Sequence, residues 1–110
     1  MPDHDRVALV ERWLQLTRRV LPGVAAEHAW PIRLDHCFMR VFLDQAVGGQ
    51  WDRVVARPAI RHMPGPLLAR AVALAERSLA EPGILPALNA ESLAWRRAQR
   101  RVGARAGAVG

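Results

Sequence analysis

The sequence contains no lysine, although 16 of its 110 residues are basic, so each of these cations is an arginine. Without a lysine amine the chain cannot form a Schiff base with a carbonyl substrate or attach pyridoxal phosphate. It also lacks the lysine of a phosphate-binding P-loop, and Gly48-Gly49 is typical of a helix end, not of a glycine-rich loop. The sequence therefore predicts no bound cofactor.

Cysteine is almost absent as well, since Cys37 stands alone and excludes an intramolecular disulfide. Neither a His-Glu-x-x-His nor a Cys-x-x-Cys motif is present, so no metal site is predicted; a set of His36, His62 and Asp44 could meet only through the fold. A lone cysteine in an apolar setting is usually a core residue. As a nucleophile, Cys37 would need a base from elsewhere in the chain, for which His62 is the candidate.

Long apolar runs are missing too. No stretch approaches the roughly 20 residues that a membrane span needs. The acidic N-terminus, Met-Pro-Asp-His-Asp, lacks a signal-peptide pattern. We therefore expect a cytoplasmic protein that does not enter a membrane. With 51% apolar and 24% charged residues, the chain is expected to fold.

No segment alternates apolar and polar residues over the length of a strand, so a β-sheet is not expected. Proline and glycine instead divide the chain into pieces with apolar residues at helical spacing. The sequence predicts an all-α, single-domain bundle with a short helical turn in 51–62 and four main helices at residues 5–21, 32–47, 66–80 and 87–101. Pro22-Gly23 is expected to end the first helix. The helical domain covers residues 1–102, and the Gly/Ala/Arg-rich residues 103–110 are expected to form a flexible tail.

The net charge of +6 is concentrated at one end of the chain. Residues 96–110 hold five arginines and no acid, whereas the first 95 residues hold 11 arginines and 10 acids. A basic terminal helix can bind nucleic acid, anionic lipid or an acidic partner. It can equally be a solvated helix end whose cations are favoured by the helix dipole.

Residues 32–47 are apolar over most of a helix circumference, which is typical of a central helix. His36, Arg40 and Asp44 follow one another at i, i+4 and i+8 and form a polar stripe. Because the dipole disfavours a carboxylate near a helix C-terminus, Arg40 is expected to pair with Asp44. The stripe is then an exposed ion pair, a cleft where Arg40 binds an anion and His36 moves a proton, or a buried network that fixes packing.

Asp35 falls inside the apolar arc of the same helix, where an unpaired carboxylate would be costly. Three explanations stay open. Asp35 can cap a helix that starts at His36, it can pair inside the protein with Arg57 or Arg61, or it can take part in catalysis.

These residues define a candidate site between the central helix and the connection that follows it. The candidate catalytic residues, with a histidine acting as acid or base near neutral pH, are Asp35, His36 and His62. The candidate residues for binding a small anionic ligand are Arg40, Asp44, Arg57 and Arg61.

Three segments, LDHCFMRVFLDQAVGGQW, RPAIRHM and LNAESLAWR, resemble a group of short bacterial proteins of about this length that has no settled function. The resemblance covers about residues 30–97 and assigns no role to any of them. Some members are labelled as GCN5-related N-acetyltransferases, which implies a mixed sheet and a pyrophosphate-binding turn of the Arg/Gln-x-x-Gly-x-Gly/Ala kind. Neither the strands nor the turn is found in this sequence.

Four functions therefore stay open. The first expectation is a protein-interaction or homodimerising module that uses exposed apolar surface and the basic last helix. The alternatives are a small helical enzyme or binder of an anionic ligand, a member of the acetyltransferase-labelled group, and a nucleic-acid binder. The last has the charge of such proteins, but no helix-turn-helix spacing is present.

Overall fold

The computed structural model describes residues 3–109, with side chains from residue 5 to residue 101. Every regular element in these residues is helical, and none of them forms a strand. In chain order the elements are α1 (Asp3–Gln15), the π-helical turn η1 (Leu16–Val20), α2 (Leu21–Val24), α3 (Asp35–Val47), the 3-10 turn η2 (Trp51–Arg53), α4 (Ala59–His62), α5 (Gly65–Ala80), the 3-10 turn η3 (Pro82–Ile84) and α6 (Leu85–Val109). The predicted all-α fold with four main helices is confirmed.

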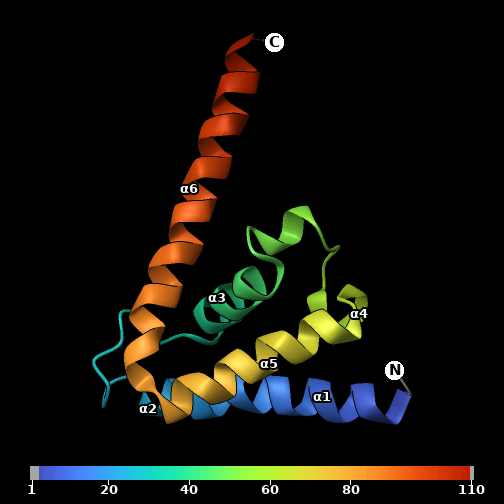
Figure 1. The fold of residues 1–110 in the computed structure, drawn as a ribbon, viewed down its shortest axis with the longest axis vertical. Coiled ribbons are helices and arrows are strands. Elements are labelled where there is room, and N and C mark those ends of the chain that lie inside the picture. Colours follow the sequence, from blue (N-terminus) through green and yellow to red (C-terminus); the bar gives the residue numbers. More distant parts are fainter. Residues whose placement is uncertain (1–2, 110) are drawn as a thin grey trace.

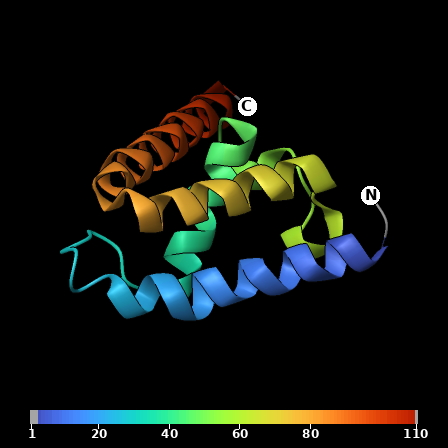
Figure 2. The ribbon, with the colours of Figure 1, turned by 60° about the horizontal axis from the view of Figure 1, so that its bottom comes forward.

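The central helix of the bundle is α3, as its apolar circumference predicts. It contacts elements on several sides, namely α2, η1, η2, α5 and α6. α1 and α5 run alongside each other, and α3 crosses them at a steep angle (Figures 1 and 2). Residues on α3 can therefore reach both the first helix and the last one, which decides where a site can form.

The first helical region continues past Pro22, so the expected end at Pro22-Gly23 is wrong. The N–H of Leu21 bonds to the carbonyl of Leu16, five residues back, and closes the π-helical turn η1. Pro22 then stands in the first turn of α2. Because proline has no N–H to donate, the backbone of this continuous helical stretch lacks one hydrogen bond at this residue.

The ends of α3 follow from its backbone. Leu34 is extended, with φ −98° and ψ 150°, and the helix begins at the next residue. Gly48 has a φ of 78° and its N–H bonds to the carbonyl of Asp44 at 2.8 Å. Glycine adopts this left-handed conformation at no steric cost, so the prediction that Gly48-Gly49 ends the helix is confirmed.

Aromatic and aliphatic side chains from all six α-helices and from the segments between them form one core. The largest fully buried apolar side chains include Trp13, Leu16, Phe38, Phe42, Met63 and Leu68. Burying a side chain of this size contributes about 1.5–3 kcal/mol, which is enough for the core to fix the crossing of α3 over its neighbours.

The last helix, α6, is the longest and lies at the edge of the bundle. It packs on α3 and η3, and its C-terminal half extends away from the other helices (Figure 1). The helix continues to Val109 and so passes through residues that the sequence assigns to a flexible tail. Flexibility of residues 103–110 stays a prediction, and Gly110 lies outside the described residues.

Candidate functional site

Asp44, in the last turn of α3, has a side chain with no exposed surface. Its carboxylate accepts two hydrogen bonds from Arg96 of α6, at 2.8 Å from Nε and 2.9 Å from Nη2. It also accepts hydrogen bonds from the Ser92 hydroxyl at 2.6 Å and from the Trp51 backbone N–H at 3.0 Å. The expected pairing with Arg40 is therefore wrong, because the cation comes from a helix 52 residues further along the chain.

These four hydrogen bonds make the burial of Asp44 tolerable, since a buried carboxylate needs partners for its oxygens. The hydrogen bonds from Arg96 to Asp44 also act on the cation, and they raise the pKa of Arg96 above its ordinary value although burial opposes the shift. The pair joins α3 to α6.

Arg40 lies one turn before Asp44 and holds two neutral side chains of α6. Its Nη1 donates to Ser92 Oγ and its Nη2 to Asn89 Oδ1, each at 2.7 Å. Ser92 accepts from Arg40 while it donates to Asp44, so a single hydroxyl joins the cation to the carboxylate. Burial, helped by the nearby charge of Arg96, lowers the pKa of Arg40 below its ordinary value, although Cys37 and Asp44 act in the opposite direction.

The side chains that bond to Arg40 and Asp44 of α3 form a polar stripe of their own on α6. Asn89, Ser92 and Arg96 are spaced by three and four residues and so share one face of the helix. The sequence did not reveal this stripe, because Arg96 also begins the arginine-rich segment 96–110 and was assigned to it. The third explanation of the α3 stripe, a buried polar network, describes Arg40 and Asp44.

Asp52 of η2 forms a second acidic centre beside this network. Its carboxylate accepts hydrogen bonds from Arg57 Nη2 at 2.6 Å and from Gln50 Nε2 at 2.9 Å, and Arg96 Nη2 lies 4.0 Å away. Burial acts to raise the pKa of Asp52, but the hydrogen bonds from Gln50 and Arg57 and the charges of Arg57 and Arg96 together hold it below its usual range. Arg57 also lies 5.2 Å above the Trp51 ring, which is a cation–π contact.

A cleft of about 430 Å³ opens beside these arginines. Its apolar lining consists of Trp13, Leu14, Met39, Leu43, Trp51, Pro58, Ala59 and Ile60. Its polar lining is basic and consists of Arg18, His36, Arg40, Arg57 and Arg96. Among the described side chains, no acidic one lines the cleft, although Asp44 and Asp52 contact two of its arginines.

Three of the predicted site residues therefore meet in this cleft: His36, Arg40 and Arg57. His36 is 73% exposed, and its Nδ1 lies 3.6 Å from the carboxylate of Asp35. Arg18 and Arg96, which the sequence analysis did not select, complete the basic lining. Arg18 could not be found from the sequence because it comes from η1, far from the central helix in the chain.

The other predicted residues lie outside the cleft. Asp35 is the first residue of α3; its side chain is 52% exposed, and its Oδ1 accepts a hydrogen bond from the His36 N–H at 2.7 Å. A buried pair with Arg57 or Arg61 is therefore wrong, and the cap position itself belongs to Leu34.

Arg61 and His62 lie on α4, are exposed and do not line the cleft. The candidate acid–base pair of His36 and His62 is thus not assembled in this cleft. Cys37 is half-buried, packs against the core as expected, and does not line the cleft either.

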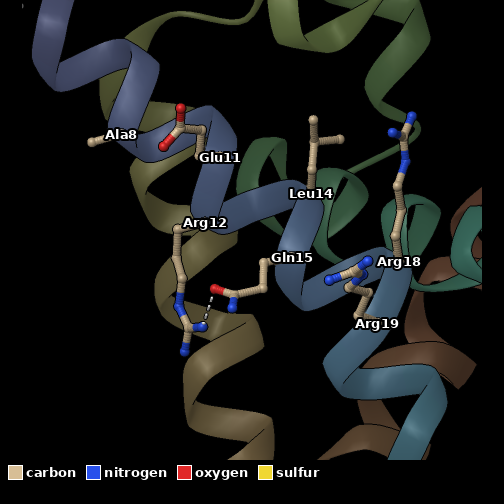
Figure 3. A pocket seen from close by; sticks show the side chains of 7 residues that line it. All are labelled: Ala8, Glu11, Arg12, Leu14, Gln15, Arg18 and Arg19. Atoms are coloured by element: carbon tan, nitrogen blue, oxygen red, sulfur yellow. Dashed lines mark hydrogen bonds between the residues drawn. The ribbon is translucent and has the colours of Figure 1, made fainter.

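A second, shallower hollow follows α1 and η1 (Figure 3). All its lining residues come from a single helical stretch, between Ala8 and Arg19, so no second element closes it. Arg12 donates to Gln15 Oε1 at 2.8 Å there and is neutralised by two hydrogen bonds to Glu76 of α5. Arg18 extends away from this pair, and it is shared with the cleft together with Leu14.

No three His, Cys, Asp or Glu side chains among those described are grouped so that they could hold a metal ion. In the same part of the chain, no helix combines the length and the apolar character that crossing a bilayer requires. Comparison of the chain with family models, with curated proteins and with solved structures gives no match. Conclusions about function therefore depend on the geometry of the cleft and of α6.

Proposed function

We propose that this protein binds a small anionic ligand with an apolar body in the cleft between η1, α3 and α6. The observation that carries the proposal is the lining itself, in which four arginines and one histidine accompany eight apolar residues. Ligand pockets of about 300–1,000 Å³ typically combine apolar walls with a few polar groups that fix orientation. A carboxylate or phosphate group on an apolar body satisfies both parts of this lining.

The charges of the lining favour an anion. Asp52 neutralises Arg57, and Asp44 neutralises Arg96. Arg40 contacts neutral oxygens of Ser92 and Asn89, and Arg18 makes no hydrogen bond or ion pair with any described residue. Four arginines of the lining thus share two acidic partners, which leaves a net positive charge at the cleft. Guanidinium groups bind carboxylates and phosphates through paired N–H donors, so an anion would replace the lost solvation of Arg40.

The lining supports binding better than catalysis. His36 is the one histidine among the lining residues and is 73% exposed, and its neighbour Asp35 does not line the cleft. His62, the second candidate for acid–base chemistry, does not line the cleft either. The acetyltransferase label of the resembled proteins implies a mixed sheet, and residues 3–109 contain no strand on which to base it.

A protein-interaction or homodimerising role has less support. The large apolar side chains that are exposed, Val7, Leu34, Val54 and Leu93, belong to four separate parts of the described chain. A docking surface for another protein is usually a continuous apolar patch, whereas scattered exposed residues are normal. This role stays a prediction, and sedimentation of the protein at increasing concentration tests it directly.

Isothermal titration calorimetry with octanoate, benzoate and inorganic phosphate tests the anion-binding proposal. We expect the two amphiphilic carboxylates to bind more tightly than phosphate, because phosphate leaves the apolar floor unused. Arg18→Gln removes a lining cation that makes no other contact and should weaken binding about tenfold or more, since a charged hydrogen bond contributes about 1.5–3 kcal/mol.

Arg61→Gln is the matched control, because Arg61 is exposed on the neighbouring α4 but does not line the cleft. The Arg61→Gln variant should bind the two carboxylates with the affinity of the unaltered protein. Equal losses in the two variants, or the absence of heat with all three anions, would contradict the proposal.

A further inference from the structure

The second half of α6, residues 97–109, forms an arm that leaves the bundle (Figure 1). The first half of the helix is anchored, because Asn89, Ser92 and Arg96 bond to side chains of α3. From Arg97 to Arg101 no side chain makes a hydrogen bond or an ion pair with the described residues. The arm is therefore a helix fixed at one end and presented to solvent.

The arm is basic on one face. Arg97, Arg100 and Arg101 are exposed, and their spacing of three and four residues puts them side by side. The sequence adds Arg105 and holds no acidic residue after Glu91. Because no carboxylate of the described side chains pairs with these cations, their full charge faces solvent.

A free helix of this composition is marginally stable. Most helical stability in proteins comes from packing against neighbours, which this segment lacks. Gly103 and Gly107 are poor helix formers compared with alanine, and the like charges of Arg97 and Arg101 repel at i,i+4. A polyanion alongside the arm would remove the repulsion and supply the missing partner.

We propose that the arm binds the phosphate backbone of double-stranded nucleic acid without sequence preference. A helix with its side chains is about 10–12 Å wide and fits a DNA major groove of about 12 Å. Three exposed arginines on one face match rows of phosphates, and contacts of this kind confer affinity but little specificity. This surface is separate from the cleft, so the inference does not depend on the proposed ligand.

The composition of the arm favours nucleic acid over an anionic membrane. Helices that lie in a membrane interface need an apolar face of large residues opposite the basic one. After Trp95, the only apolar residues in the sequence larger than alanine are Val102 and Val109. The arm thus offers charge without the apolar face that would insert among lipid chains.

Fluorescence anisotropy of a labelled 20-base-pair DNA duplex with the full chain tests the proposal. With three phosphate contacts, affinity should fall roughly 40-fold between 50 and 200 mM salt. The triple variant R97Q/R100Q/R101Q should lose most of the binding at 50 mM salt and most of the salt dependence.

The control R33Q/R53Q/R61Q removes the same charge from three exposed arginines that make no described contact, and it should keep most of the affinity. Circular dichroism checks that both variants fold. Absence of duplex binding at 50 mM salt, equal losses in both variants, or tighter binding to phosphatidylserine vesicles than to the duplex would overturn the proposal.

Discussion

Asp44 and Arg96 form a two-bond ion pair whose carboxylate is fully buried between α3 and α6. Such a pair is not in itself strong stabilisation, because both charges give up water. The pair favours one arrangement of the two helices over others in free energy, because a shift of α6 would leave the buried Asp44 carboxylate without its cation. Together with Ser92, the pair sets where α6 leaves the bundle.

Replacing Arg96 by glutamine should lower the free energy of unfolding by about 3–5 kcal/mol, because it leaves a buried carboxylate without its counterion. Urea denaturation followed by circular dichroism measures the change. Arg97→Gln, at the adjacent exposed position, should stay within about 0.5 kcal/mol of the unaltered protein. A small effect of Arg96→Gln would mean that Asp44 is not held as described.

Replacing Ser92 by alanine should destabilise the protein by about 1–3 kcal/mol, because one hydroxyl satisfies both Arg40 and Asp44. Asn89→Ala removes a single bond to Arg40 and should cost less. Chemical denaturation of both variants gives the comparison. If Asn89→Ala proved the more damaging change, the bridging role of Ser92 would be wrong.

The pairing of Glu76 with Arg12 predicts a pH dependence of stability. The hydrogen bond from Arg12 holds the pKa of Glu76 below its ordinary value of 4.5 in the folded protein. The folded state therefore binds fewer protons, so the stabilisation is present above about pH 4.5 and is lost as the pH falls through the folded pKa. Because both side chains are well exposed, the effect is small.

Glu76→Gln should accordingly lower Tm at pH 7, and the difference from the unaltered protein should shrink as the pH falls below 4.5. Thermal melts at several pH values measure it. Glu11→Gln removes an exposed carboxylate that pairs with no described residue and serves as the control. A difference that grew towards low pH would contradict the sign of the shift.

Replacing Gly48 by alanine should cost about 1–2 kcal/mol, because alanine is strained in the left-handed conformation that ends α3. Gly49→Ala is the matched control, since a Cβ at either glycine meets nothing within 4 Å and Gly49 has no positive φ. Thermal denaturation of the two variants separates backbone strain from crowding. Equal Tm values would show that the left-handed conformation is not required.

The fold class was predictable because prolines and glycines separate segments of helical length. Within each segment, the spacing of the apolar residues marks the face of the helix that is buried. The partner of Asp44 could not be predicted in this way. Helical spacing points to Arg40, one turn away, whereas the actual partner, Arg96, is 52 residues away in the chain. Asp35 was placed in an apolar arc because the helix was assumed to begin at residue 32. It begins at Asp35, whose side chain faces solvent. The first error concerns how separate segments meet and the second concerns where a helix begins, and periodicity within one segment encodes neither.

Arg96 lines the cleft and also holds α6 to α3, so one guanidinium belongs to both surfaces of the molecule. The side chain that fixes the base of α6 thus forms part of the wall of the cleft. An affinity lost on replacing Arg96 would therefore reflect both a lost lining residue and a loosened helix. Arg18, whose side chain makes no hydrogen bond or ion pair with the described residues, changes the lining alone.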